Sequence, residues 1–168
     1  MRLLAVLASS LVLGACVSAP GCARPTAPEG HEVVELGGRT FTLELVADPA
    51  TRERGLGGRE SIPEDGGMLF SFPDSQIRHF VMRDCLVPID IVFLDSDGRI
   101  VAMHHMPVEP PRAENETALQ YDRRLKRYSS RFNARYAIEI RGGTLDELDL
   151  QPGQKVELDT ERLARVTR

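Results

Sequence analysis

Short segments in which apolar and polar residues alternate recur along this chain, and they constrain its fold more than any other feature. Val33–Leu36 and Phe41–Val46 are two such segments, and Gly37-Gly38 between them has the composition of a tight turn. Alternation with a period of two is typical of strands that bury one face. The region therefore predicts a β-hairpin.

A second hairpin is predicted in the middle of the chain. Ile89–Leu94 is almost continuously apolar, which is typical of a strand buried on both faces. Asp95–Gly98 has turn composition, so Arg99–Met106 is expected to return as the antiparallel partner. Further strands are expected at Met68–Phe72, ending at Pro73, at Tyr136–Ile140 and at Lys155–Leu158.

Two short helices are indicated by their capping residues. Asp48 can accept hydrogen bonds from free N–H groups, Pro49 is favourable in a first helical turn, and Gly55 should end that helix. Thr144 with Glu147 three residues later has the spacing of a capping box. Pro107 to about Asn133 is polar and longer than a usual connection, with a short helical piece expected near Leu119–Tyr128.

These elements show no βαβ alternation. They predict an α+β domain, mainly an antiparallel β sandwich or small barrel-like sheet with two short flanking helices. After residues 1–15, about 150 residues remain, enough for one domain with a substantial core.

The N-terminus predicts export. Arg2 precedes an apolar run that is too short to span a bilayer, and Gly14-Ala15-Cys16 follows it. The segment resembles a bacterial lipoprotein signal peptide covering residues 1–15, with Cys16 as the acylated residue; an ordinary cleaved signal is the alternative. Val17, where Asp would favour inner-membrane retention, suggests a lipid-anchored protein of the cell envelope, at the outer membrane facing the periplasm.

Composition separates a tether from a domain. Residues 16–31 are rich in Pro, Ala and Gly, as in a flexible tether, and residues 32–168 are expected to form the single domain. The net charge is −4 with both signs mixed, so nucleic acid is not an expected partner. Cys22 and Cys85 could pair in an oxidising envelope, but a buried thiol is the expected state of Cys85.

Several motifs together resemble one family. They are Arg52–Arg59, similar to R-x-x-G-L-M-x-R, Gly67–Phe72, matching G-M-L-F-x-F, and Phe80–Ile91, similar to F-W-M-x-N-T-x-x-P-L-D-I. Phe93–Asp95, Gly98–Ile100 and Ala137–Gly142 extend the similarity, which spans residues 40 to 158. The chain thus resembles the domain of unknown function number 192 family, which is uncharacterised and occurs in bacteria and archaea.

The resemblance implies a compact β-rich fold with flanking helices, and many relatives are exported or lipid-anchored. It implies no established chemistry. Gly57, Val81 and Asp84-Cys85 stand where the family has Met, Trp and Asn-Thr, so any site built from those side chains is altered here.

Four polar residues are candidates for a ligand-binding site. Asp90 lies between two isoleucines and needs a partner if it is buried. Arg54 and Arg59 offer the bidentate fork that suits a carboxylate. Either these residues form an ion pair between helix and sheet, or Arg54, Arg59, Asp90 and Glu139 form the polar end of a small-ligand pocket.

Soft-metal binding is an alternative. His79, Met82, Met103 and His104 would suit copper if their strands came together, although neighbouring His104 and His105 should point to opposite faces of a strand. Packing of these residues in the core is the simpler expectation, because they lack the spacing of established metal sites.

No catalytic residue is assigned. The chain has no G-x-S-x-G, H-E-x-x-H or P-loop motif, and Cys85 with a histidine is a generic combination. The sequence favours a non-enzymatic, lipid-anchored module that binds a small ligand or an envelope protein, without a cofactor. A copper-binding envelope protein and a hydrolase that holds Cys85 beside His79 are the alternatives.

Overall fold

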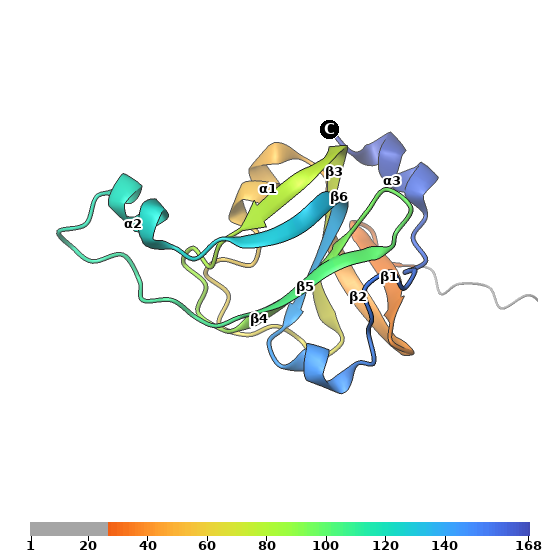
Figure 1. Ribbon diagram of the computed structural model, residues 1–168, viewed down its shortest axis with the longest axis horizontal. Coiled ribbons are helices and arrows are strands. Elements are labelled where there is room, and N and C mark those ends of the chain that lie inside the picture. Colours follow the sequence, from red (N-terminus) through yellow and green to blue (C-terminus); the bar gives the residue numbers. More distant parts are fainter. Residues whose placement is uncertain (1–26) are drawn as a thin grey trace, which may run out of the picture.

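A single twisted sheet organises the molecule. The computed structural model describes residues 27–168, so the predicted signal segment, Cys16 and Cys22 lie outside the described residues. Six strands form the sheet in the order β1-β2-β3-β6-β4-β5 (Figure 1). Their bounds are β1 His31–Leu36, β2 Arg39–Val46, β3 Gly66–Phe80, β4 Ile89–Leu94, β5 Ile100–Met106 and β6 Tyr128–Arg141.

The α+β, mainly antiparallel prediction is confirmed. Every neighbouring pair of strands is antiparallel except β2 and β3, which run parallel. Both predicted hairpins form, as β1-β2 and β4-β5. β4 is buried along its whole length because β5 and β6 flank it and side chains cover both of its faces.

Three α-helices and one 3-10 helix accompany the sheet: α1 Pro49–Arg54, α2 Ala118–Arg124, η1 Thr144–Glu147 and α3 Thr160–Val166. α1 begins as predicted, since Asp48 accepts from the N–H groups of Ala50 and Thr51 at 3.1 Å. α2 lies in an arm that projects from the sheet (Figure 1). Its capping box is formed by Thr117 and Gln120.

Two local predictions are corrected. Thr144 does not cap η1; it is buried in the first turn, and Gly143 precedes the turn without a side-chain cap. Lys155–Leu158 is not a strand, because it makes only an isolated bridge from Lys155 to Arg99 at the edge of the sheet.

β3 runs beyond Pro73, where the sequence predicted its end. The pairing of β3 with β6 shifts register between Ser71 and Gln76, and Pro73 lies in this irregularity. A proline has no N–H to donate, and a bulge removes the need for one. β3 can therefore continue to Phe80, and β6 begins earlier than predicted, at Tyr128.

The sheet buries a hydrophobic cluster on each face. Side chains of a strand alternate between faces, so Val92 and Leu94 of β4 belong to one cluster, and Ile91 and Phe93 belong to the other. The C-terminal residues Val156 and Leu163 complete the first cluster. The second, which also holds Leu56, lies on the side of α1.

Candidate functional site

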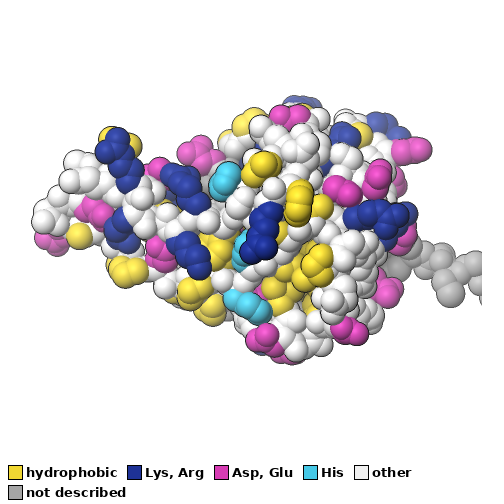
Figure 2. Space-filling view, viewed as in Figure 1, with side chains coloured by type: hydrophobic (Ala, Val, Ile, Leu, Met, Phe, Trp, Pro, Cys, Tyr) yellow, Lys and Arg dark blue, Asp and Glu magenta, His cyan; other side chains and the backbone are white. Residues whose placement is uncertain are grey.

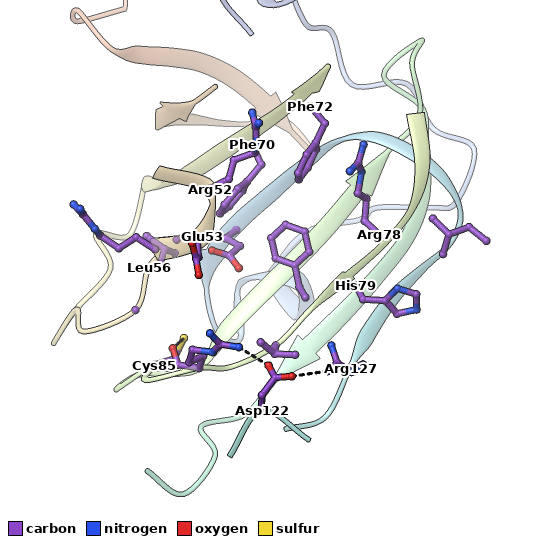
Figure 3. A pocket seen from close by; sticks show the side chains of 18 of the residues that line it. Arg52, Glu53, Leu56, Phe70, Phe72, Arg78, His79, Cys85, Asp122 and Arg127 are labelled. Atoms are coloured by element: carbon purple, nitrogen blue, oxygen red, sulfur yellow. Dashed lines mark hydrogen bonds and ion pairs between the residues drawn. The ribbon is translucent and has the colours of Figure 1, made fainter. Parts of the chain in front are cut away.

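A pocket of about 540 Å³ opens on the α1 side of the sheet. Such a volume falls within the range of small-molecule sites. Its lining comes from α1, β3, β6, the segment after β3 and the α2 arm (Figure 3). The lining side chains include Phe70, Phe72, Phe80, Cys85 and Glu139, with arginines at 52, 54, 78, 83 and 127.

Glu139 is the buried polar group of this pocket. Its side chain comes from β6, the residue is only 5% exposed, and its Oε2 atom has no hydrogen-bond partner among residues 27–168. Burial disfavours the charged form and raises the pKa of Glu139 from 4.5 to about 8. Near neutral pH the group is therefore mainly a carboxylic acid, which can donate a hydrogen bond to a bound molecule.

The end of α1 approaches Glu139 closely because residue 55 is glycine. Gly55 has a φ of 52°, in the left-handed region that favours glycine. A Cβ at this position would lie 3.7 Å from Glu139 Oε2 and 3.5 Å from Phe70 Cζ. The helix end thus forms a wall of the pocket without covering the carboxylic acid with a side chain.

Aromatic rings form the apolar part of the pocket. Phe80 makes edge-to-face contacts with Phe70 and Phe72, with ring centroids 5.1 and 6.4 Å apart. The guanidinium groups of Arg52 and Arg78 lie 5.4 and 4.0 Å from the ring centroid of Phe72. The two guanidinium groups therefore hold the Phe72 ring in place and cover part of it, so only the rest of the ring faces the pocket.

Of the four predicted ligand-binding residues, the structure brings only Arg54 and Glu139 to this pocket. Arg59 binds Glu44 with both Nη atoms, at 2.5 and 2.6 Å, and lines a separate hollow. This contact lowers the pKa of Glu44.

Asp90 lies on the opposite face of the sheet from Glu139. Glu139 is opposite Ile91 in the register of β4 with β6, so Asp90, one residue earlier, points the other way. Asp90 is 1% exposed; it accepts from His105 Nδ1 at 2.9 Å and from the Leu145 N–H at 2.8 Å. The predicted ion pair of Asp90 with Arg54 or Arg59 is therefore not formed, and the four residues do not share one pocket.

The four candidate metal ligands also fail to converge. Met82 is buried on the α1 side, whereas Met103 packs against the cluster on the other face. His104 Nε2 lies 2.7 Å from the Ser129 carbonyl oxygen, and exposed His79 lines the pocket. Within residues 27–168, no three His, Cys, Asp or Glu side chains form a group that could hold a metal ion.

Cys85 and His79 line the same pocket, the arrangement that a cysteine hydrolase would need, but they lie at different sides of it (Figure 3). The Cys85 thiol donates to the Arg83 carbonyl oxygen at 3.5 Å. Burial, with the nearby Glu139 and Asp84, raises the pKa of this thiol to about 12. A thiol that is protonated near neutral pH is a poor nucleophile, so the geometry does not favour this chemistry.

Most of the pocket lining could not be predicted from the sequence. Arg127 is far from Arg78 and Arg83 in the chain, and the pairing of β3 with β6 brings the two regions together. The phenylalanines at 70 and 72 share a face by strand alternation, and this was the signal available for an aromatic wall.

Comparison with known proteins supports the fold and the family. A solved structure described as a "putative transcription regulator" from Sinorhizobium meliloti 1021 is 31% identical, with a TM-score of 0.62 over 79% of this chain and 96% of that chain. A protein of unknown function from Novosphingobium aromaticivorans DSM 12444 is 25% identical, with a TM-score of 0.61 over 86% of this chain and 100% of that chain. No curated protein matches the chain.

In the part of the chain that the structure describes, no helix has the length and apolar character needed to cross a membrane. The family model for DUF192, described as an uncharacterized ACR, matches residues 32–158. Most of the chain, including the whole pocket lining, lies in this range, and the protein therefore belongs to the DUF192 family.

Proposed function

We propose that this protein is a small-ligand-binding module of the bacterial cell envelope, and that the ligand occupies the pocket beside α1. Glu139 is the observation that carries the proposal. A carboxyl group buried with an unpartnered oxygen destabilises the fold, and such a group is unusual unless it serves a site. A ligand atom that accepts a hydrogen bond from the Glu139 carboxylic acid would supply the missing partner and remove this destabilisation.

The ligand would have an apolar body and a hydrogen-bond acceptor. Phe70, Phe72 and Phe80 supply the apolar contacts, and the Glu139 carboxylic acid supplies the donor. The pocket lining combines these aromatic side chains with many polar ones, so the apolar body and the polar group of the ligand would each have partners. The proposed role is binding, because the thiol at this pocket, Cys85, has a raised pKa and donates to a backbone carbonyl oxygen.

A lipid anchor on Cys16 would hold this module at the membrane. The proposal rests on the apolar run and the Gly14-Ala15-Cys16 ending; two or more acyl chains give stable attachment. In a bacterial host, the wild type should fractionate with membranes and Cys16→Ser should not. Membrane recovery of Cys16→Ser would overturn the anchor and leave the pocket proposal intact.

Transcription regulation, the role in the description of the Sinorhizobium relative, fits this chain less well than small-ligand binding does. A DNA-binding surface normally carries a concentrated positive charge. Here the net charge is −4, and acidic and basic residues are mixed along the sequence.

Prodan, a neutral naphthalene dye with one ketone acceptor, can test the pocket, because its emission reports both polarity and hydrogen bonding. We expect saturable binding to the full chain. Val81→Trp would place a large ring in the pocket and should weaken binding at least about tenfold. Val108→Trp, the same change at an exposed position outside the pocket, should leave binding unchanged.

Glu139 variants test the hydrogen bond. Glu139→Ala removes the donor and should weaken prodan binding about tenfold with a blue shift of emission, whereas Glu139→Gln keeps an amide donor and should stay close to the wild type. Absence of binding to the wild type, or equal binding by Val81→Trp and Val108→Trp, would overturn the proposed function.

A further inference from the structure

The pocket carries an excess of positive charge. Five arginines line it, against the surface carboxylates of Glu53 and Asp122 and the buried Glu139. On the face shown in Figure 2, Lys and Arg side chains lie over the α2 arm and the middle of the sheet, with hydrophobic and acidic side chains among them. The pocket lining itself carries more basic than acidic groups, although the net charge of the chain is −4.

Two of the five arginines are used by the fold. Arg52 donates to the carbonyl oxygens of Ser71 and Arg168, at 2.9 and 2.7 Å. Arg78 binds Asp74 and donates to the Ala134 carbonyl oxygen at 3.3 Å. These guanidinium groups have much of their donor capacity filled by the protein, and they hold the ring of Phe72 between them.

The other three retain unused capacity. Arg83 and Arg127 share the single carboxylate of Asp122, with Arg127 Nη2 3.0 Å from Asp122 Oδ2 (Figure 3). Arg54 is exposed and has no ion pair within residues 27–168. Each guanidinium has five N–H donors, so one carboxylate cannot satisfy them or neutralise their charge. Arg83 and Arg127 lie together at the pocket through Asp122 and keep a net positive charge with it, so this pair favours a further anion.

We propose that the ligand is an apolar acid, that is, a flat ring or short chain that lies against the phenylalanines and carries one carboxylate or similar anion, which binds Arg83 and Arg127. This inference names the ligand class and rests on the proposed function. The acceptor that binds Glu139 lies on the apolar body, away from the anion, because a protonated acid and a cluster of arginines recognise different groups. The volume of about 540 Å³ admits a ligand of this kind.

An acid and its methyl ester form a matched pair for the test, because they share one apolar body and differ in charge. 6-Acetyl-2-naphthoate and methyl 6-acetyl-2-naphthoate should both displace prodan from the full chain, each through its ring and ketone. In a buffer of physiological ionic strength, we expect the acid to bind about tenfold more tightly than the ester.

Arginine variants test which residues cause the preference for the acid over the ester. The double variant Arg83→Gln/Arg127→Gln should reduce the acid-to-ester preference to about threefold or less, with ester affinity unchanged. Arg112→Gln/Arg123→Gln is the control, since it removes the same charge from exposed positions of the α2 arm outside the pocket. That control should keep the wild-type preference.

The outcomes separate the two proposals. Equal affinity for the acid and the ester in the wild type, or equal loss of preference in both double variants, would overturn the ligand class while prodan binding still supports the pocket. If the wild type bound neither prodan nor the acid and ester, the proposed function itself would be overturned. Thermal melting of each variant shows whether it is folded; because these arginines are exposed, we expect the variants to fold as the wild type does.

Discussion

Two buried carboxyl groups, those of Asp90 and Glu139, lie on opposite faces of one sheet and have different hydrogen-bond surroundings. Asp90 is closed in by a ring nitrogen of His105 and the N–H of Leu145, so each of its oxygens has a donor. Glu139, at the corresponding depth on the other face, has a buried oxygen with no donor in the described residues and borders a cavity. A buried carboxyl oxygen without a hydrogen-bond donor destabilises the folded state. The fold contains such an oxygen at Glu139 and none at Asp90.

The difference separates a structural group from a candidate site. A carboxylate with both oxygens bonded joins elements, as Asp90 joins β4 to β5 and η1. A carboxyl group with an unpaired oxygen, such as Glu139 beside aromatic rings and arginines, can form a hydrogen bond with a bound ligand. Satisfaction of hydrogen bonds, more than burial itself, distinguishes the two.

The pH dependence of stability is the largest test of this comparison. The raised pKa of Glu139 means that the folded state holds a proton that the unfolded state releases above pH 4.5. The free energy of unfolding should therefore fall as pH rises from about 4.5 to about 8, by an amount on the order of 5 kcal/mol. Urea unfolding at a series of pH values measures it.

Glu139→Gln isolates the contribution of this group. The variant cannot ionise, so the difference between its curve and the wild-type curve should change over this pH window and level off above it. Glu157→Gln, at an exposed position, is the control and should follow the wild type. If the Glu139→Gln curve ran parallel to the wild-type curve, Glu139 would not be the buried acid described above.

Asp90→Ala should give the next largest effect. It leaves the Leu145 N–H without its acceptor and removes the bond to His105, so we expect a loss of about 3 kcal/mol in the free energy of unfolding near neutral pH. Asp97→Ala, in an exposed turn, should change stability much less. A loss no greater than that of the Asp97 variant would remove the contrast between the two carboxylates.

Arg59→Gln should have the smallest effect. Its pair with Glu44 is more than one-third exposed at both side chains, and such pairs contribute at most about 1 kcal/mol. Because the pKa of Glu44 is lowered by this contact, the small contribution should be lost as pH falls through that lowered pKa. Denaturant unfolding at neutral and acidic pH checks it, and a large loss at neutral pH would place Arg59 among the essential structural groups.

Local sequence signals predicted the elements that local interactions determine. The hairpin between Val33 and Val46, the turn at Asp95–Gly98 and the start of α1 at Asp48-Pro49 depend on neighbours in the chain. The length of β3 past Pro73 depends on its register with β6, which lies more than fifty residues away. The sequence contained the bulge residue but no information on its distant partner.

The candidate site was predictable only in part, for the same reason. Arg54 and Glu139 were recognised by their chemistry, and both lie at the pocket. Asp90 was recognised as a carboxylate that needs a partner, but the face to which it points is fixed by the register of β4 with β6. Its partner, His105, follows from the register of β4 with β5, where the two residues are directly opposite.

The position of β6 also affects how the chain can be made. β6 pairs with both β3 and β4, so until it emerges from the ribosome β1-β2-β3 and β4-β5 remain two ladders with no shared backbone hydrogen bonds. Assembly through such distant pairings is slow, and it must wait for nearly the whole chain to be synthesised. The proposed signal segment requires the chain to pass through a translocation channel unfolded. Because β6 is synthesised late, it would delay folding and so keep the chain competent for translocation.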